Sequence, residues 1–158
     1  MQGGARLDRS QPVGCIVAHI PAPAGPGELN ELGRSECFRL LAGGVIVRVA
    51  FTDAALPAVQ PVSYHLDGEE IVFRTRNGSK LAAATRHAVV GFEVDEFDVP
   101  ARAGWSVLSI GEAYEVVDPA RLAAVARDFP DPWVRDHDAH TISIPLQVVT
   151  GRRIVADR

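Results

Sequence analysis

The sequence predicts a mostly β fold, an antiparallel barrel of six strands with peripheral helices. Three observations support this class. Six segments are rich in β-branched and aromatic residues, the helical segments between them are short, and the connections resemble hairpin turns. Because parallel strands need a crossover of about a dozen residues or more, short connections favour antiparallel pairing.

One domain accounts for most of the chain. The 158 residues are 47% hydrophobic and 23% charged, which suits a globular domain with its own core. Residues 1–27 differ from the rest, because they end in PAPAGPG and show no periodic apolar face. We therefore expect a flexible N-terminal arm at 1–27 and a folded domain at 28–158.

Charge and hydropathy argue against several classes of partner. The net charge of −4 gives no global basic field of the kind that attracts nucleic-acid phosphates. No apolar run reaches the roughly 18 residues of a membrane span, and the first residues lack the pattern of a signal peptide. These features predict a cytoplasmic protein with no nucleic-acid or membrane partner.

The first element after the arm is predicted to be a helix. Apolar residues recur near helical spacing from Glu28 onward, and Gly43-Gly44 supplies a stop. A nearly all-apolar strand follows at 44–51, with a composition typical of burial on both faces.

The next two strands form a predicted hairpin. They lie at 58–66 and 69–75, with the turn-forming Asp67-Gly68 between them. Pro61 lies inside the first of these strands. Since proline has no N–H to donate to a ladder, we expect it at an edge, at a bulge or beside a ligand.

The rest of the chain alternates short helices with strands. In chain order, the sequence predicts a short helix at 79–87, a strand at 87–96, a long strand at 104–117 and a final strand at 140–149. Gly111 is the predicted bend of the long strand. Asp118-Pro119 predicts the start of a further helix, because aspartate is a good N-cap and proline suits the first helical position.

The segment IVFRTRNGSKL at 71–81 concentrates positive charge where a strand meets a predicted helix N-terminus. Its basic and hydroxyl side chains are Arg74, Thr75, Arg76, Ser79 and Lys80, and this lysine is the only one in the chain. Unpaired N–H groups and the helix dipole suit an anion at such a place, so a phosphate monoester is the favoured ligand. A solvated turn that caps a surface helix is the alternative. The chain has neither a Walker loop nor a dinucleotide-binding glycine motif.

Four segments of the chain, taken in order, form a recognisable set. They are PVSYHLDGEEIVFRTRNGSKL at 61–81, FEVDE at 92–96, GWSVLSIGEA at 104–113 and TGRRI at 150–154. Together they resemble the pyridoxamine 5'-phosphate oxidase-like family of FMN-binding split barrels. The resemblance spans residues 28–154 and implies a six-stranded antiparallel split barrel with bound FMN.

The resemblance also implies a set of cofactor-binding residues. They are Pro61, Val62, Ser63, Arg74, Thr75, Ser79, Lys80, Trp105 and Ser106. The first three would meet the edge of the isoalloxazine ring, the next four would hold the phosphate, and the last two would reach the flavin from the partner subunit. The family pattern therefore implies a homodimer with the flavin at its interface. For Trp105, a plain core role is the alternative.

Two polar clusters favour simpler interpretations. His137 and His140 lie three residues apart beside aspartates, which suggests a metal site, but no further Cys or His pattern supports it and a polar loop is favoured. The acids in FEVDEFD at 92–98 are interpreted as a solvated strand end rather than a catalytic carboxylate pair.

The predicted function is that of an FMN-dependent oxidoreductase with an unidentified small-molecule substrate. In such an enzyme the flavin performs the electron chemistry, so no protein side chain need act as a nucleophile. The chain lacks the C-terminal Trp and Arg pattern by which the true oxidase holds pyridoxal, so we do not expect that activity. The alternatives are a deazaflavin-dependent reductase, and a flavin-binding or haem-binding carrier or sensor without turnover.

Overall fold

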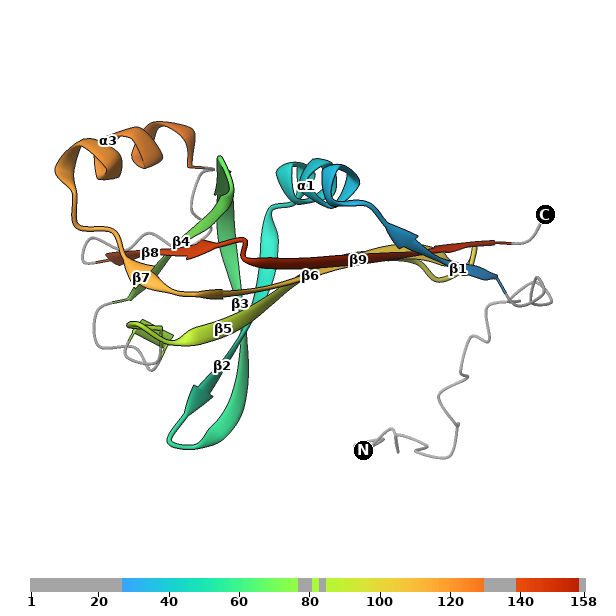
Figure 1. The fold of residues 1–158 in the computed structure, drawn as a ribbon, viewed down its shortest axis with the longest axis horizontal. Helices are drawn as coiled ribbons and strands as arrows, with labels where there is room; N and C mark the ends of the chain where they lie inside the picture. Colours follow the sequence, from blue (N-terminus) through green and yellow to red (C-terminus); the bar gives the residue numbers. More distant parts are fainter. Residues whose placement is uncertain (1–26, 77–80, 83–84, 130–138, 157–158) are drawn as a thin grey trace, which may run out of the picture.

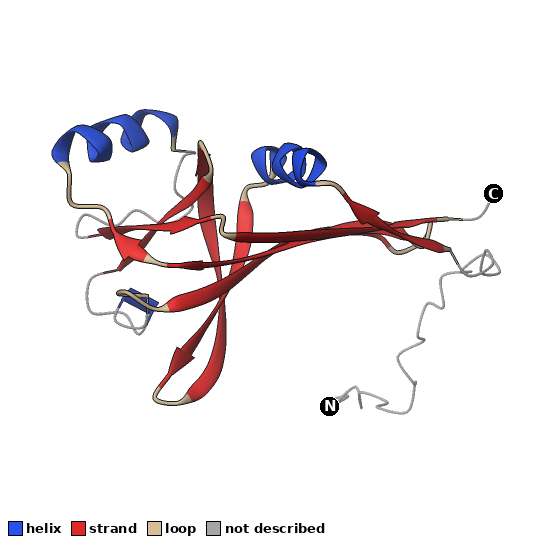
Figure 2. Ribbon diagram, in the orientation of Figure 1, coloured by secondary structure: helices blue, strands red, loops and turns tan. Residues whose placement is uncertain are grey.

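An antiparallel sheet forms the body of the molecule in this computed structural model, which describes residues 27–76, 81–82, 85–129 and 139–156. Nine strands and two helices lie within these residues (Figures 1 and 2). They are β1 (Glu28–Leu32), α1 (Arg34–Gly43), β2 (Ile46–Asp53), β3 (Leu56–Asp67), β4 (Glu70–Arg76), β5 (Val89–Asp98), β6 (Ala103–Glu112), β7 (Tyr114–Glu115), α3 (Pro119–Asp128), β8 (Ala139–Pro145) and β9 (Val148–Val155).

The sheet closes on itself through two long, broken strands. The strand order is β1-β9-β6-β5-β2-β3-β4-β8-β7, and neighbouring strands are antiparallel. A single residue separates β6 from β7, and two residues separate β8 from β9. β6 pairs with β9 near one end of this strand order, whereas β7 pairs with β8 at the other end. The segments β6–β7 and β8–β9 therefore connect the two ends of the sheet. The predicted fold class, a mostly β antiparallel split barrel with peripheral helices, is confirmed.

The predicted number of six strands is wrong, since the described residues form nine. The predicted strand at 104–117 is divided into β6 and β7, and the predicted strand at 140–149 is divided into β8 and β9. Both breaks lie where the ribbon turns from one side of the barrel to the other. Continuous β-branched sequence marks the strands but gives no sign of these corners.

The predicted helix from Glu28 is wrong over its first five residues, which form β1. Leu29 and Leu32 have helical spacing, but the segment pairs along its length with β9, from Glu28 opposite Val155 to Leu32 opposite Gly151. Tertiary pairing overrides the local pattern here. The helix begins at Arg34 instead.

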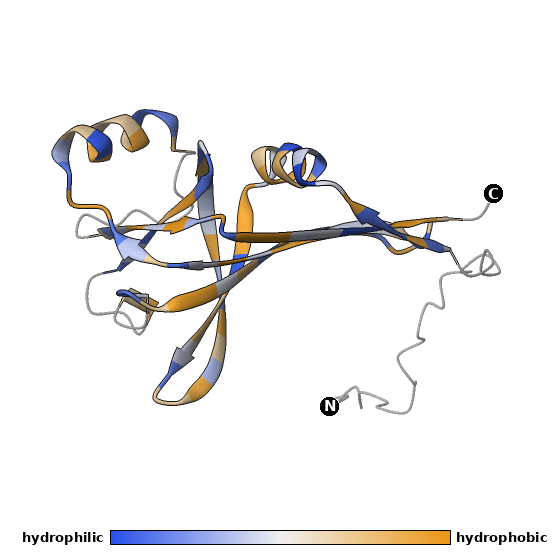
Figure 3. Cartoon of the chain, in the orientation of Figure 1, coloured by the Kyte–Doolittle hydropathy of each residue, from blue (hydrophilic) through white to orange (hydrophobic). Residues whose placement is uncertain are grey.

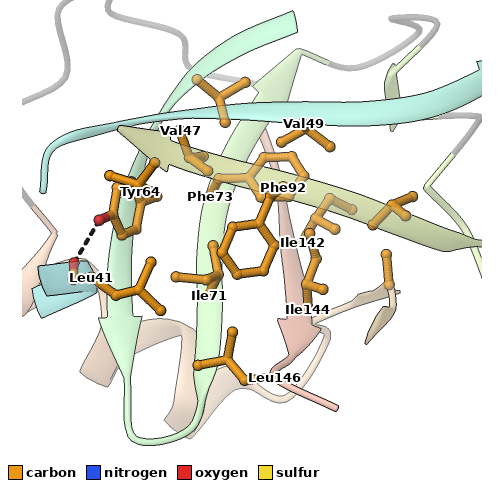
Figure 4. Packing of buried hydrophobic residues seen from close by; sticks show 14 of the residues in the cluster. Leu41, Val47, Val49, Tyr64, Ile71, Phe73, Phe92, Ile142, Ile144 and Leu146 are labelled. Atoms are coloured by element: carbon orange, nitrogen blue, oxygen red, sulfur yellow. Dashed lines mark hydrogen bonds between the residues drawn. The ribbon is translucent and has the colours of Figure 1, made fainter. Parts of the chain in front are cut away.

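The core lies inside the barrel and is built from alternate residues of its strands. Every second residue of β2 is buried, in the pattern expected for a strand with one face toward the core. The largest fully buried side chains include Tyr64, Ile71, Phe73, Phe92, Ile142 and Ile144, which pack together from β3, β4, β5 and β8 (Figure 4).

The two described helices cover different parts of the barrel (Figure 1). α1 packs on β9, β6 and β3, and its Cys37 lies so close to β9 that a Cβ on Gly151 would be 2.5 Å from the Cys37 sulfur. α3 lies near β7, β8 and β4 at the other end. Neither of these ten-residue helices is long or apolar enough to cross a membrane, and no other helix in the described part of the chain is.

A row of apolar and small residues crosses the outer face of the sheet. Figure 3 shows apolar positions, in orange, recurring along the strands. The members of the row are direct register partners on β3, β2, β5, β6 and β9, namely Val59, Ala50, Gly91, Ile110 and Val148. Register partners share a face, so these residues lie together. The valines and the isoleucine are between 39% and 64% exposed. We call this set the outer apolar row.

Candidate functional site

The pairing between β3 and β4 stops part-way along both strands. Its last register pair is Tyr64 with Phe73. Beyond this pair, β3 continues to pair with β2, and β4 continues to pair with β8. The two strands therefore separate into a fork, whose arms are residues 56–63 of β3 and residues 74–76 of β4.

The β3 arm directs backbone groups toward the open side of the fork. The Tyr64 N–H donates a hydrogen bond to the Val45 carbonyl, 3.1 Å away, on the β2 side. Because the N–H groups of an antiparallel strand point alternately to its two sides, the Ser63 N–H and C=O point away from β2. Pro61 has the same orientation, so its missing N–H leaves the β2–β3 ladder intact. Of the three places expected for Pro61, an edge, a bulge or a position beside a ligand, the structure shows a locally unpaired edge of β3.

The β4 arm directs Arg74 and Thr75 to opposite faces. Thr75 is 6% exposed and lies on the core side, with Phe73. Arg74 lies on the other side, where its Cζ is 4.9 Å from the ring centroid of Phe129, at the end of α3. Within the described residues, Arg74 forms no ion pair with a carboxylate. Its guanidinium therefore lies over an aromatic ring, and no carboxylate of the described residues neutralises its charge.

A histidine and a carboxylate lie beside the core side of the β4 arm. His140 on β8 is the register partner of Thr75, and its Nδ1 forms a hydrogen bond with Glu115 on β7. Arg86 Nε lies 3.6 Å from the other oxygen of the Glu115 carboxylate. The hypothetical metal partner His137 lies outside the described residues. Among those that are described, no cluster of three or more His, Cys, Asp or Glu residues could hold a metal ion.

An ionic network fastens α3 to the face of β4 that carries Arg74. The Arg121 guanidinium is 2.6 Å from the Glu70 carboxylate and 3.3 Å from the Asp67 carboxylate. The hydroxyls of Tyr114 and Ser143 also donate to Glu70. Burial favours a raised pKa for Glu70, but the hydrogen bonds from Arg121, Ser143 and Tyr114 outweigh it and lower this pKa. The same carboxylate raises the pKa of Arg121.

The start of α3 fixes where these contacts form. The Asp118 carboxylate accepts a hydrogen bond of 2.7 Å from the Arg121 N–H, and Pro119 occupies the first helical turn. The predicted helix start at Asp118-Pro119 is confirmed.

Comparison with known proteins places this fold in a family. The family model described as pyridoxamine 5'-phosphate oxidase matches residues 33–153. The chain belongs to this family. An uncharacterised protein of Mycobacterium tuberculosis is 40% identical over 141 residues, which cover 86% of this chain and 92% of the relative.

Solved structures agree with this assignment. An FAD-binding protein from Mycobacterium smegmatis has a TM-score of 0.73 and 31% identity, and the match covers 81% of this chain and all of that one. A protein from the same organism that binds FAD and haem has a TM-score of 0.64 over 81% of this chain and 76% of that one. At 15% identity, this second structure shows only the shared fold.

In this member of the pyridoxamine 5'-phosphate oxidase family, the fork brings together five of the residues predicted from the sequence. They are Pro61, Val62, Ser63, Arg74 and Thr75. The Val62 side chain is 9% exposed, and its N–H and C=O point to β2 within the ladder, so Val62 presents neither to the open side of the fork. The predicted Ser79 and Lys80 lie outside the described residues.

Trp105 and Ser106 do not lie at the fork of the same chain. Both are on β6, which β5 and β2 separate from β3. Trp105 packs against the core, whereas Ser106 alternates to the outer face, opposite Asp95 and Arg152. Sequence reasoning missed Phe129 and Glu115, because only the folded chain brings them to β4 and His140.

Proposed function

We propose that this chain is a flavoprotein that binds FMN at the fork and acts as an oxidoreductase on a small molecule. One observation carries the proposal. Ser63 and Arg74 are the residues next to the last β3–β4 pair, so the outward backbone of Ser63 and the Arg74 guanidinium, which no described carboxylate neutralises, lie on adjacent arms.

The residues at the fork fit a phosphorylated flavin. A planar ring edge with hydrogen-bonding atoms suits the outward N–H and C=O of Ser63 and the outward C=O of Pro61. A phosphate suits Arg74, with Ser79 and Lys80 as further donors in the proposed set, while Thr75 belongs to this set from the opposite face of the β4 arm. The flavin would supply hydride or electron transfer, while the chain positions it and the substrate.

The relatives support a flavin rather than another nucleotide. The Mycobacterium smegmatis structure with 31% identity is an FAD-binding protein, and FAD contains the whole of FMN. The single phosphate of FMN matches the basic and hydroxyl residues that lie close together in the sequence at 74–80, so FMN is our choice.

We also propose that two copies share the site. The outer apolar row exposes Ile110 and Val148 on a sheet face that no described helix covers, and such a surface is typical of a protein interface. A partner on this side would bring its own Trp105 and Ser106 toward the fork. The flavin would then lie between two subunits, as in the proposed homodimer.

An absorption spectrum tests the cofactor directly. The purified chain is incubated with FMN, FAD, a deazaflavin or haem, freed of excess ligand and examined by visible absorption beside a size-exclusion measurement. We expect about one FMN per chain on a dimer-sized species. Retention of FAD alone would correct the cofactor and keep the site, whereas a folded protein that retains no flavin would overturn the proposal.

Turnover is tested separately. The loaded protein is mixed with reduced nicotinamide cofactors and an electron acceptor, and oxidation of the nicotinamide is followed. Activity that depends on bound FMN supports an oxidoreductase. A stable flavin complex without activity toward any donor would favour a carrier or sensor.

A further inference from the structure

Two side-chain contacts join α3 to β4. Arg121 in the first half of the helix contacts Glu70, and Phe129 at its end contacts Arg74. Both contacts join the same ten-residue helix to the same strand. The Arg121–Glu70 ion pair therefore helps to hold α3, and with it Phe129, in place over β4.

The contact with Phe129 leaves the guanidinium N–H donors of Arg74 available to a ligand. The Arg74 Cζ lies over the Phe129 ring, 4.9 Å from the ring centroid, and this contact uses none of the guanidinium N–H groups as a hydrogen-bond donor. These N–H donors point outward in the plane of the group, so they remain able to bind a phosphate in a forked geometry. A carboxylate partner would occupy these donors, and the described part of the chain provides none for Arg74.

We propose that Phe129 is a positioning residue for phosphate recognition. Its ring holds the Arg74 guanidinium in the orientation that presents the N–H edge to the phosphate of the flavin, and the Arg121–Glu70 ion pair holds Phe129 in place. This inference rests on the proposed FMN site and adds α3 to it as a part of the phosphate-binding apparatus.

Titrations with FMN and riboflavin test this role, because riboflavin has the same ring system but no phosphate. We expect Phe129→Leu, which keeps an apolar side chain but removes the ring, to weaken FMN binding about three- to fivefold. Riboflavin affinity should not change, and Phe129→Tyr should retain the FMN affinity of the wild type. Equal losses for both ligands would show a general structural effect and overturn the proposal, as would an unchanged FMN affinity.

Arg74→Ala separates this proposal from the proposed function. We expect it to weaken FMN binding by tenfold or more, and the double variant Arg74→Ala/Phe129→Leu to be no weaker than Arg74→Ala alone. Additive losses in the double variant would contradict the coupling of Phe129 to Arg74. If Arg74→Ala leaves FMN affinity intact, the phosphate assignment itself fails, and if the wild type binds no flavin, the proposed function fails first.

Discussion

The phenol of Tyr64 joins α1 to the barrel at the root of the fork. The residue is 1% exposed, and its hydroxyl donates a hydrogen bond of 2.5 Å to the Leu41 carbonyl near the end of α1 (Figure 4). A Cβ on Gly44 would lie 2.2 Å from this hydroxyl, so the contact leaves no space for a larger residue there. Burial raises the pKa of Tyr64 to about 12.

This raised pKa predicts a loss of stability in alkali. Below the ordinary tyrosine pKa of 10.0, the folded and unfolded states both keep the proton. Between pH 10.0 and about 12, the unfolded state loses its proton first, so the free energy of unfolding falls, by about 2 to 3 kcal/mol in total. Tyr64→Phe should be about 1 kcal/mol less stable at neutral pH but should lack this decline. Urea unfolding of both proteins across the range measures the difference, and parallel declines would contradict it.

Whether a residue of the site could be predicted depends on how far away in the sequence its contact partners lie. Arg74, Thr75 and the 61–63 segment could be predicted, because their residue types and a family pattern mark them locally. Phe129 and Arg121 could not, because their roles depend on which strand α3 covers, and no local pattern specifies that partner.

At the level of elements, the corner between β6 and β7 depends on one glycine. Gly111 was predicted as a bend, and the strand break follows two residues later, at Ala113. A Cβ at Gly111 would lie 2.0 Å from the Pro145 carbonyl oxygen, on the strand that leads into the other corner. The two broken strands therefore pass each other with backbone almost in contact.

Gly111→Ala should destabilise the protein by about 2 kcal/mol or more, because the added methyl group forces the two corners apart. Gly91→Ala is the matched control on the neighbouring strand β5, since its Cβ would meet only Ala50 Cβ and the Ser109 carbonyl at 3.8 Å. Thermal and urea unfolding of both variants provide the comparison. Equal stability of the two variants would show that the corners can move at little cost.

The strand hairpins were predicted better than the ends of the fold. The Asp67-Gly68 turn and alternating apolar residues identify β3 and β4 because the signals are local. β1 was assigned as helix because its pairing partner, β9, lies more than a hundred residues away in the sequence. A short stretch of sequence contains no signal of such distant pairing.

For the whole molecule, the outer apolar row is the feature that bears on assembly. Ile110 is a large apolar member of the row, flanked on neighbouring strands by Gly91 and Val148. On the same face, one step along the strands, Arg48 forms an ion pair with Asp95. An apolar centre beside a charged margin is the usual composition of an interface between subunits.

Ile110→Glu should therefore shift the protein from the proposed dimer to a monomer and reduce flavin retention at the same time, because a buried, unpaired carboxylate opposes association. Val99→Glu is the control, since Val99 is 79% exposed and lies in a turn away from the row. Size exclusion with absorbance detection measures both the oligomeric state and the amount of flavin retained. A dimer that persists in Ile110→Glu would place the subunit interface elsewhere.

The open side of the fork also has a consequence for isotope exchange. Along β3, the N–H groups of Gln60 and Val62 point to β2 and are held in the ladder, whereas those of Val59 and Ser63 point outward. In deuterated water, the outward amides should exchange fast and the inward ones slowly, so a single strand shows both rates in alternation. Bound FMN should slow the exchange of the Ser63 amide proton and leave the exchange of the Val62 amide proton unchanged. The exchange rate of the Ser63 amide therefore reports whether the fork is occupied.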